Sequence, residues 1–287
     1  MKSAAPAAKD GAGTERIVTR MPVDRKGRPM SDDVATTAVR AVEAGGEYLR
    51  ERFQSGETDA DYDEHDVKAR ADRESEARML EIIREAHPDH RIYAEESGEH
   101  DGESDYRWIV DPLDGTNNFA VGLSTFAAAA AVLDGGRPES AAVYAPIPDD
   151  LYVARAGEGV RHDGDPVAAT DGDAVPLERA TVGVVIGRRV KGDDDRAAAA
   201  AAIGDALDDA CKRFIWAWAP TVYWGLLARG RLDAMVTLYP DDEEQVAGDL
   251  LAREAGCVHR RAGPLSAYVA NPANLDPLWA ALGPAME

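Results

Sequence analysis

The sequence predicts a layered fold of the α/β or α+β class, in which helices and strands are mixed. Apolar stretches typical of buried strands occur in both halves of the chain, and helical stretches lie before and between them. These elements do not follow a strict β-α-β rhythm, which favours layered packing of sheets and helices. With 287 residues, the chain is long enough to bury a large core as one domain or as two fused subdomains.

The first half is expected to hold two helices followed by several strands. The helices cover residues 32–54 and 72–86 and are separated by an acidic loop, Glu57–Asp66. The pair Gly45–Gly46 weakens the first helix, because glycine has low helix propensity. A loop punctuated by glycines follows the last strand. The predicted strands are Arg91–Ala94, Trp108–Val110, 125–133, 141–145 and 151–155.

The second half is expected to alternate strands with helices. Its first helix is rich in alanine, and no internal repeat is visible in this half or in the first. The predicted strands are Thr181–Ile186, Phe214–Trp216 and Leu232–Leu238, and the predicted helices are Asp193–Asp209, Thr221–Arg229 and Glu243–Ala255.

The N-terminal segment and the length of the apolar runs indicate where in the cell the protein is expected. Residues 1–30 are predicted to be a flexible N-terminal tail, and residues 31–287 the folded domain, with subdomains of about 31–175 and 176–287. The N-terminal segment lacks the apolar run of a secretory signal, and no stretch of 18 apolar residues occurs. We therefore expect a cytoplasmic protein with no membrane partner.

Charge is the most unusual feature of the composition. The chain carries 53 acidic and 32 basic residues, for a net charge of −21. Nucleic acid is not expected as a partner, because binding it requires a basic surface. Lysine is rare relative to arginine, and an acid-rich, lysine-poor surface suits a protein that stays soluble in concentrated salt. A halophilic source, such as a halophilic archaeon, is the favoured explanation, with an ordinary acidic protein as the alternative.

The segment WIVDPLDGTNNF, residues 108–119, is the most specific signal in the chain. An apolar strand delivers Asp111 at its end, and Asp114 follows three residues later, so both carboxylates can converge on one cation. Hard divalent cations such as Mg²⁺ prefer oxygen ligands of this kind. Backbone N–H groups at Gly115 and Thr116 stand where a turn or helix start favours a phosphate oxygen. Metal-binding carboxylates and a phosphate site therefore share one segment.

Three further acidic segments accompany this motif. AEESG, residues 94–98, ends a strand in Glu95 and Glu96. Asp72 closes the segment DVKARAD and is interpreted either as a metal ligand or as a helix N-cap. Glu244 begins a helix in EEQVAGDLLAREAG, residues 243–256, where it is either a functional carboxylate or a favourable acidic residue of the first helical turn.

Together these segments resemble the inositol monophosphatase family, whose superfamily also holds fructose-1,6-bisphosphatases and phosphoadenosine-phosphate phosphatases. The family pattern W-I-x-D-P-[LI]-D-G-T-x-N-F matches Trp108–Phe119 almost completely, G-E-E-S matches Ala94–Ser97, and D-x-V-T-E-A-D matches Asp66–Asp72 loosely. Residues 143–167 and 228–234 also resemble family segments. The resemblance runs from about residue 32 to 258 and implies a layered αβαβα sandwich, an α+β fold, and a homodimer.

The resemblance also implies roles for individual residues. Glu95, Asp111 and the carbonyl of Leu113 would hold one Mg²⁺, and Asp111, Asp114 and Glu244 a second. Glu95, with Asp72 as a further candidate ligand, would hold a third. Glu95 and Thr116 would orient and deprotonate the attacking water. The remaining implied contacts bind phosphate or substrate, and they fall on Asp114, Gly115, Thr116 and Glu244.

Two departures from the family pattern concern the second metal and the substrate. Glu243 and Glu244 stand where the family usually has Trp-Asp. Trp218, Ala219 and Pro220 stand in place of the Gly-Ser-Ala segment that contacts substrate. Trp218 would narrow or reshape a polyol pocket, and the neighbouring aromatic residues either line a pocket or pack in the core. Those neighbours are Phe214, Trp216, Tyr223 and Trp224.

The predicted function is Mg²⁺-dependent, lithium-sensitive hydrolysis of a small phosphorylated metabolite by metal-activated water. The substrate is expected to be of the inositol monophosphate or fructose 1,6-bisphosphate type. One alternative is a phosphatase of the 3'-phosphoadenosine 5'-phosphate type, and another is a catalytically silent relative that binds metal or a phosphometabolite. The pair Arg188–Arg189 is either a contact for a second phosphate or a solvated basic turn.

Overall fold

The computed structural model describes residues 33–58, 60–62, 67–170 and 174–283 of the chain. Within these ranges, the side chains of residues 60–62, 67–69, 189 and 242–244 are not described. The predicted tail, residues 1–30, lies outside the described residues.

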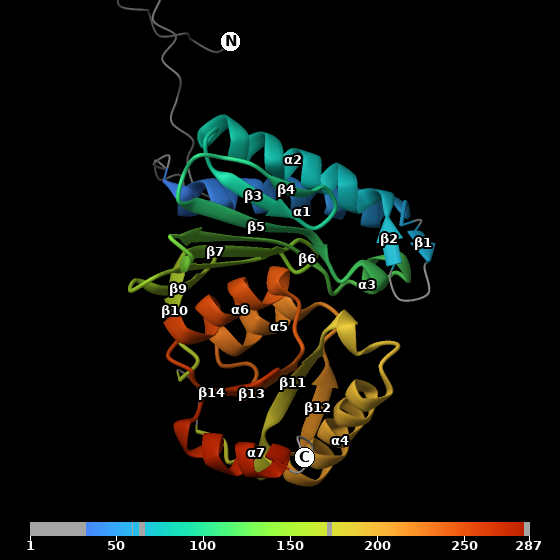
Figure 1. Cartoon of the computed structure of the whole chain (residues 1–287), viewed down its shortest axis with the longest axis vertical. Helices are drawn as coiled ribbons and strands as arrows, with labels where there is room; N and C mark the ends of the chain where they lie inside the picture. The colour runs from blue at the N-terminus through green and yellow to red at the C-terminus, as the bar shows by residue number, and fades with distance from the viewer. Residues whose placement is uncertain (1–32, 59, 63–66, 171–173, 284–287) are drawn as a thin grey trace, which may run out of the picture. The chain divides into compact units, whose positions relative to one another are not determined.

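Helices and sheets alternate in layers (Figure 1). Helices α1 (Val34–Ser55) and α2 (Arg70–Ala86) cover one face of an eight-stranded sheet. Its strand order is β10-β9-β8-β7-β6-β5-β3-β4, and only β3 and β5 pair in parallel. The strands are β3 (Arg91–Ala94), β4 (Gly98–His100), β5 (Tyr106–Asp114), β6 (Ala127–Asp134), β7 (Arg137–Ala145), β8 (Asp150–Arg155), β9 (Gly159–His162) and β10 (Asp165–Val167).

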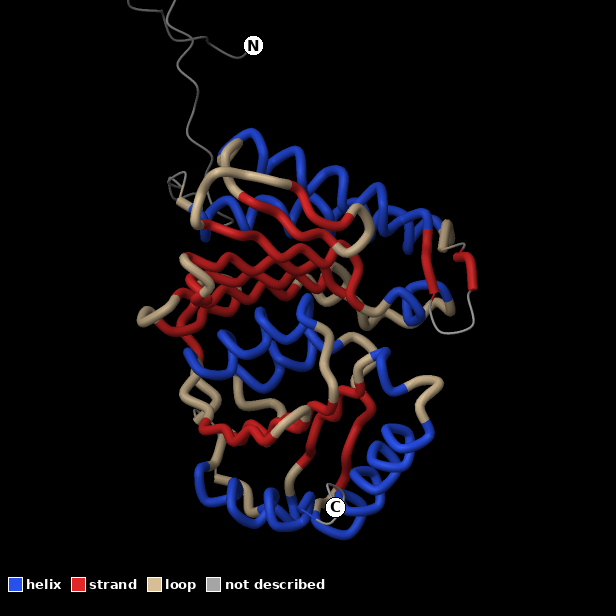
Figure 2. The backbone as a smooth tube through the Cα atoms, viewed as in Figure 1, coloured by secondary structure: helices blue, strands red, loops and turns tan. Residues whose placement is uncertain are grey.

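A second sheet of five strands lies on the far side of two helices, α5 (Pro220–Ala228) and α6 (Asp242–Glu254) (Figure 2). Helices α4 (Asp194–Ala210) and α7 (Leu275–Leu282) cover its outer face. The layers therefore run αβαβα, and the predicted α+β sandwich is confirmed. The strand order is β12-β11-β13-β15-β14, from β11 (Thr181–Ile186), β12 (Arg213–Trp216), β13 (Ala234–Leu238), β14 (Val258–Ala262) and β15 (Leu265–Val269).

One apolar cluster joins the two sheets through the helices between them. Ile109 and Ala129 from the first sheet, Met235 from the second, and Leu251 from α6 all belong to it and are almost fully buried. Burial of this kind is the main favourable term in folding. The predicted subdomain boundary near residue 175 falls between the two sheets and remains a prediction.

Short elements complete the described chain. β1 (Ala60–Tyr62) pairs with β2 (Val67–Ala69), and α3 (Thr116–Ala120) follows β5. Three single-turn 3-10 helices are η1 (Leu177–Arg179), η2 (Arg188–Val190) and η3 (Pro272–Asn274). None of the described helices is both long and apolar enough to cross a membrane.

Helix α1 runs without a break through Gly45–Gly46, where the sequence indicated weakness. The reason is tertiary packing. A Cβ at Gly45 would lie 2.7 Å from Ser75 Oγ of α2, and a Cβ at Gly46 would overlap the ring of Tyr144 on β7. The glycines let α1 approach both neighbours closely, and the buried contact outweighs the low helix propensity.

The glycine-rich stretch after β8 is a pair of short strands rather than the predicted loop. β9 and β10 pair across the turn Asp163–Gly164, where both residues have positive φ. Asp-Gly at such a turn is a hairpin signal. The sequence analysis also did not identify β4, β14, β15 or α7, whose short or polar stretches carry little periodicity.

The close approach at Gly46 is testable. We expect Gly46→Ala to lower the free energy of unfolding by about 1–3 kcal/mol, because the added methyl group displaces the buried Tyr144 ring. Urea denaturation in concentrated salt measures this. Gly283→Ala is the matched control, since a Cβ there meets nothing within 4 Å. Equal stabilities for the two variants would show that α1 has room to move.

Candidate active site

A bulge in β5 places Asp111 and Asp114 in one cavity. Side chains alternate between the faces of a strand, so residues three apart normally point in opposite directions. In the pairing of β5 with β6, however, Asp111 faces Ala129 and Asp114 faces Ala127, with an irregularity between them. The extra residue restores both carboxylates to the same side. Pro112 fits at the bulge because it has no N–H to offer the ladder.

The cavity has a volume of about 420 Å³ and lies where the end of β5 meets the end of β11 and the start of α6. The first sheet and the residue after β3 contribute most of its acidic groups, and α3 contributes Thr116 and Asn117. Arg188 of η2 and Lys191, which directly follows η2, contribute two basic side chains. The residues that line it are Glu95, Asp111, Leu113, Asp114, Gly115, Thr116, Asn117, Val185, Ile186, Gly187, Arg188, Val190, Lys191, Ala217, Trp218, Pro220 and Asp241.

Asp114 is held by the N-terminus of α5. The backbone N–H of Thr221 donates to Asp114 Oδ2 at 2.6 Å, and the Thr221 hydroxyl donates to the same oxygen. Both partners are fully or almost fully buried. Because α5 packs against the second sheet and Asp114 belongs to the first, this contact joins the two halves of the molecule at the cavity.

Burial raises the pKa of Asp114 to about 7, and the nearby Glu95 carboxylate adds to the rise. The two hydrogen bonds from Thr221 and the positive charge of Arg188 act in the opposite direction. A carboxylate that loses its hydration is easier to protonate unless a cation stands beside it. The site therefore disfavours an ionised Asp114 in the absence of a further positive charge.

Thr116 is fixed between two oxygen atoms. Its hydroxyl lies 3.0 Å from the carbonyl oxygen of Leu113 and 3.3 Å from Asp72 Oδ1. Asp72 is 2 % exposed and does not line the cavity. Helix α2 begins at Arg70, so Asp72 lies inside its first turn and is not the N-cap that the sequence left open. Its hydrogen bond with Thr116 connects it to the cavity.

Gly115 is required by two constraints. Its φ is +92°, which residues with a side chain rarely adopt, and a Cβ would lie 2.8 Å from the Ala219 Cβ. The chain can thus turn sharply from β5 into α3 while passing against the segment before α5. Gly115 and Thr116 both line the cavity, where their position at the start of α3 presents backbone N–H groups.

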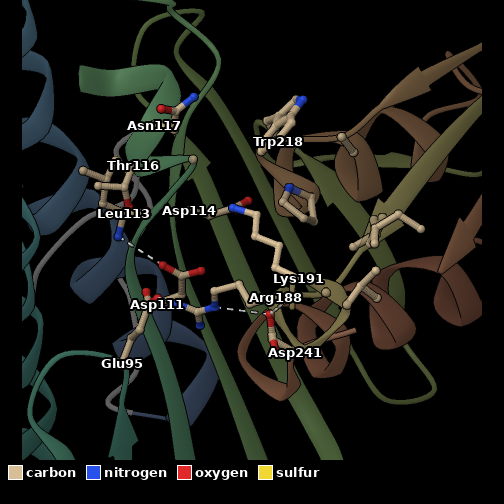
Figure 3. Close-up of a pocket in the computed structure, with 17 residues that line it drawn as sticks. Glu95, Asp111, Leu113, Asp114, Thr116, Asn117, Arg188, Lys191, Trp218 and Asp241 are labelled. Carbon is tan, nitrogen blue, oxygen red and sulfur yellow. Dashed lines mark hydrogen bonds and ion pairs between the residues drawn. The ribbon is translucent and has the colours of Figure 1, made fainter. Parts of the chain in front are cut away.

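Arg188 crosses the cavity and pairs with two carboxylates. Its Nη1 lies 2.9 Å from Glu95 Oε1, and its Nε lies 3.3 Å from Asp241 Oδ2. The Arg188 backbone N–H also donates to Asp241 at 3.1 Å. Figure 3 shows the guanidinium beside Glu95 and Asp111, and Lys191 extended toward Asp114. The sequence left Arg188–Arg189 as either a phosphate contact or a solvated basic turn, and the two ion pairs of Arg188 do not fit a purely solvated turn. The side chain of Arg189 is not described.

Trp218 stands at the cavity with 58 % of its surface exposed, and Trp216 is 39 % exposed. Trp224, by contrast, is 1 % exposed and packs in the core against Tyr268. The aromatic residues of this region therefore divide between the two interpretations, with core packing for Trp224 and an exposed position at the cavity for Trp218.

The donor atoms fit a hard divalent cation such as Mg²⁺. Glu95, Asp111 and Asp114 offer carboxylate oxygens, and Leu113 offers a carbonyl. Thr221 engages only Oδ2 of Asp114. The raised pKa of Asp114 also fits, since a bound cation would stabilise its ionised form. Within the described residues, however, these three carboxylates do not each bring one oxygen within 4.8 Å of the other two. Arg188 is paired with Glu95 in this arrangement.

The structure brings most of the predicted site residues together, with two exceptions. Glu95, Asp111, Leu113, Asp114 and the Gly115–Thr116 pair line the cavity, whereas Asp72 lies behind Thr116. The predicted role of Glu244 lies outside the described side chains. Their catalytic and ligand roles remain predictions.

Sequence reasoning missed Asp241, the N-cap residue of α6, which is 8 % exposed and lines the cavity. The acidic run 241–244 was a signal, but it offered four neighbouring carboxylates with no means of choosing between them. Lys191 was also missed, because a lysine in a turn is normally a solvated residue.

The chain is similar to several known proteins. Residues 30–276 match the inositol monophosphatase family. Nus factor SuhB of Salmonella typhimurium is 31% identical over 227 residues, which cover 77% of this chain and 82% of that protein. A fructose-1,6-bisphosphatase/inositol-1-monophosphatase of Aquifex aeolicus is 36% identical over 137 residues, 47% of this chain and 52% of that protein. The structure of inositol monophosphatase from Anabaena superimposes with a TM-score of 0.71 at 26% identity, covering 86% and 94% of the two chains.

The buried carboxylate gives a stability prediction for the metal-free protein. Asp114 titrates near 3.9 when unfolded but near 7 when folded, so folding is penalised by its ionisation above pH 7 and not below about pH 4. We expect Asp114→Asn to raise the free energy of unfolding on the order of 2 kcal/mol at pH 8 in chelator, and by less at pH 5.

Urea denaturation at the two pH values measures this difference. Asp134→Asn, at an exposed position of β6, is the control and should change stability little at either pH. If Asp114→Asn instead lowers the free energy of unfolding at pH 8, the hydrogen bonds and charges around Asp114 already offset the cost of burying its ionised form without a metal ion.

Proposed function

The chain belongs to the inositol monophosphatase family and is a phosphatase, and on that premise we propose that it hydrolyses a small phosphate monoester with Mg²⁺. The substrate is of the inositol monophosphate or fructose 1,6-bisphosphate type. The observation that supports this most directly is the meeting of Glu95, Asp111, Asp114 and Thr116 at one cavity. These residues come from β5, the end of β3 and the start of α3, and their oxygens suit both a hard cation and a bound water.

The protein's own residues divide the work of hydrolysis. Glu95, Asp111, Asp114 and the Leu113 carbonyl would hold two or three Mg²⁺ ions, with Glu244, at the start of α6, as a further proposed ligand. When bound, Mg²⁺ supplies positive charge that neutralises the phosphate and lowers the pKa of water. Thr116 orients the attacking water, and Glu95 accepts its proton. Asp72 keeps the Thr116 hydroxyl in place.

The phosphate is expected at the start of α3. Gly115 and Thr116 line the cavity there, so their backbone N–H groups would donate to its oxygens. A Cβ at Gly115 would lie 2.8 Å from the Ala219 Cβ, so this turn packs closely against the segment before α5. Donors that are already in place lower the barrier, because they need not reorganise during the reaction.

Arg188 and Lys191 favour a substrate with a second anionic group. Both line the cavity, and Arg188 is the residue that pairs with Glu95 and Asp241. A cation that takes Glu95 would free the guanidinium to bind another anion, and arginine binds phosphate through two parallel hydrogen bonds. A bisphosphate therefore fits this cavity better than a polyol with one phosphate.

Trp218 supports a second candidate, a phosphatase of the 3'-phosphoadenosine 5'-phosphate type. Its ring is 58 % exposed at the cavity, in a position where the base of a nucleotide can stack. The same substrate also carries two phosphates, so Arg188 does not separate the two candidates. A direct comparison of substrates does.

We further propose a cytoplasmic homodimer that works in concentrated salt and is inhibited by lithium. The net charge of −21 supports the salt requirement and disfavours direct binding of nucleic acid. Val121 and Leu123, which follow α3, are more than half exposed and offer an apolar surface to a second copy. Sedimentation at two salt concentrations reports the oligomeric state.

Removal of Asp111 tests the reaction itself. We expect Asp111→Asn to lower the rate of Mg²⁺-dependent phosphate release by about 100- to 1,000-fold, because it removes charge from the centre of the ligand set. Release of inorganic phosphate in concentrated salt is the measurement, with inositol 1-phosphate, fructose 1,6-bisphosphate and 3'-phosphoadenosine 5'-phosphate as substrates. Asp134→Asn is the control. Unchanged turnover in Asp111→Asn would refute the proposed cation site.

A second experiment tests the role of Arg188. We expect Arg188→Ala to raise KM for the preferred bisphosphate by about tenfold, equivalent to about 1.4 kcal/mol, and to change kcat little. KM for inositol 1-phosphate should stay the same or fall, since Glu95 loses its competing partner. Arg179→Ala, on the exposed surface of η1, is the control. An equal loss for every substrate would show that Arg188 supports the cation ligands instead.

A further inference from the structure

A second group of metal-ligating side chains lies outside the cavity. Asp150 begins β8, His162 ends β9, and Asp163 forms the turn that follows. Each offers one carboxylate oxygen or ring nitrogen, and these atoms all lie within 4.8 Å of one another. None of the three residues lines the phosphatase cavity. The group is therefore separate from the site described above.

The contacts of one nitrogen atom in this group conflict. His162 Nε2 lies 2.7 Å from Asp150 Oδ1 and 3.3 Å from Asp163 Oδ2. These contacts require a proton on Nε2. The same nitrogen lies 3.2 Å from Arg229 Nη1, a donor that requires a lone pair there. Neither the protonated nor the neutral ring satisfies all three neighbours.

Two buried polar atoms at this group also lack partners. Tyr152 is 1 % exposed, and its hydroxyl forms no hydrogen bond with the rest of the described chain. Its ring stacks on His162 with centroids 4.7 Å apart. Burial, and then the nearby charge of Asp150, raise the pKa of this hydroxyl. The Nε of Arg229 is likewise buried without a partner.

Buried polar groups are rarely left unpaired, and a cluster of them indicates that a component is missing. A cation among the three side chains would resolve the conflict. It would take the lone pair of His162 Nε2 and one oxygen from each carboxylate. Arg229 would then remain on the outer oxygen of Asp150, which it approaches to 3.4 Å.

We propose that Asp150, His162 and Asp163 bind one divalent transition-metal ion of the Zn²⁺ type. Imidazole nitrogen distinguishes this site from the all-oxygen cavity, because Mg²⁺ prefers oxygen and Zn²⁺ accepts both nitrogen and carboxylate ligands. Three protein ligands leave room for one water on the ion, and the buried hydroxyl of Tyr152, whose ring stacks on His162, would be its hydrogen-bond partner.

The position of the site indicates a structural role. Arg229 directly follows α5, whose first turn holds Asp114 through Thr221. The turn at Asp163 is tied to β8 through the Leu151 N–H, which donates to Asp163 Oδ1 at 3.0 Å. A metal ion here would join the β8–β9 hairpin to the far end of the helix that carries a wall of the cavity. Binding of an ion to the folded state alone stabilises that state.

The site can be tested with Co²⁺ and Zn²⁺ added to the full chain in saturating Mg²⁺ and concentrated salt. Visible absorption of bound Co²⁺ and calorimetry with Zn²⁺ give the stoichiometry, and ¹⁵N NMR of the histidine rings identifies the ligand. The variants are His162→Gln and Asp163→Asn. Asparagine tolerates the positive φ of 50° at position 163 and keeps an acceptor for Leu151, so the hairpin should fold. His259→Gln, in β14, is the matched control.

We expect one Zn²⁺ per chain whose affinity falls more than about tenfold in both variants and not in the control. The ring resonance of His162 should shift on addition of Zn²⁺, and the thermal midpoint should rise in the wild type only. Equal binding by wild type and His162→Gln would overturn the proposal. An unshifted ring resonance of His162 would also overturn it. The polar groups would then be paired through a protonated His162 or a bound water.

Discussion

The carboxyl group of Asp114, buried where the two sheets meet, is the constraint around which the rest of the site is arranged. Asp114 is 3 % exposed, and its pKa is raised to about 7 because it has lost its hydration. Two hydrogen bonds from Thr221, at the start of α5, replace part of the hydration that the Asp114 carboxylate has lost. A bound divalent cation would supply the remainder. A site that is costly when empty and favourable when filled is a common feature of functional centres.

The fold provides this arrangement by ending several elements at one place. β5 ends in the bulge that turns Asp111 and Asp114 to the same side, and α3, α5 and α6 begin around it. Helix starts present N–H groups, whereas the ends of β3 and β5 present carboxylates. The cavity therefore has donors on one wall and acidic acceptors on another, as hydrolysis of a phosphate ester requires.

Charge compensation in the cavity comes from residues of the second sheet's loops. Arg188 pairs with Glu95 from the first sheet and Asp241 from α6, so three distant segments are joined by one guanidinium. The same side chain lowers the pKa of Asp114. Because Arg188 pairs with Glu95, which is also a proposed metal ligand, metal binding and the position of Arg188 are linked. The α5 helix extends this linkage toward the Asp150–His162–Asp163 group at its other end.

Sequence alone determined the layered class, most helices and strands, and the segment 108–119 as the centre of the site. It could do so because apolar periodicity and the Asp-Pro-Leu-Asp-Gly-Thr pattern are local properties. Local signals also explain the failures. Short β9 and β10 have too few residues for periodicity, and Gly45–Gly46 appears unfavourable for helix until the neighbours of α1 are known.

Only the tertiary structure decided which distant side chains share the cavity. The sequence left Arg188 open between a phosphate contact and a solvated turn and did not single out Asp241. Both line the cavity because β11 ends, and α6 begins, opposite the end of β5. The same holds for Trp218, which is exposed at the cavity, and Trp224, which is buried, although both belong to one aromatic stretch. The sequence specifies the type of each side chain. Its burial and charge environment depend on contacts between segments far apart in sequence, and these contacts exist only after the layers have packed.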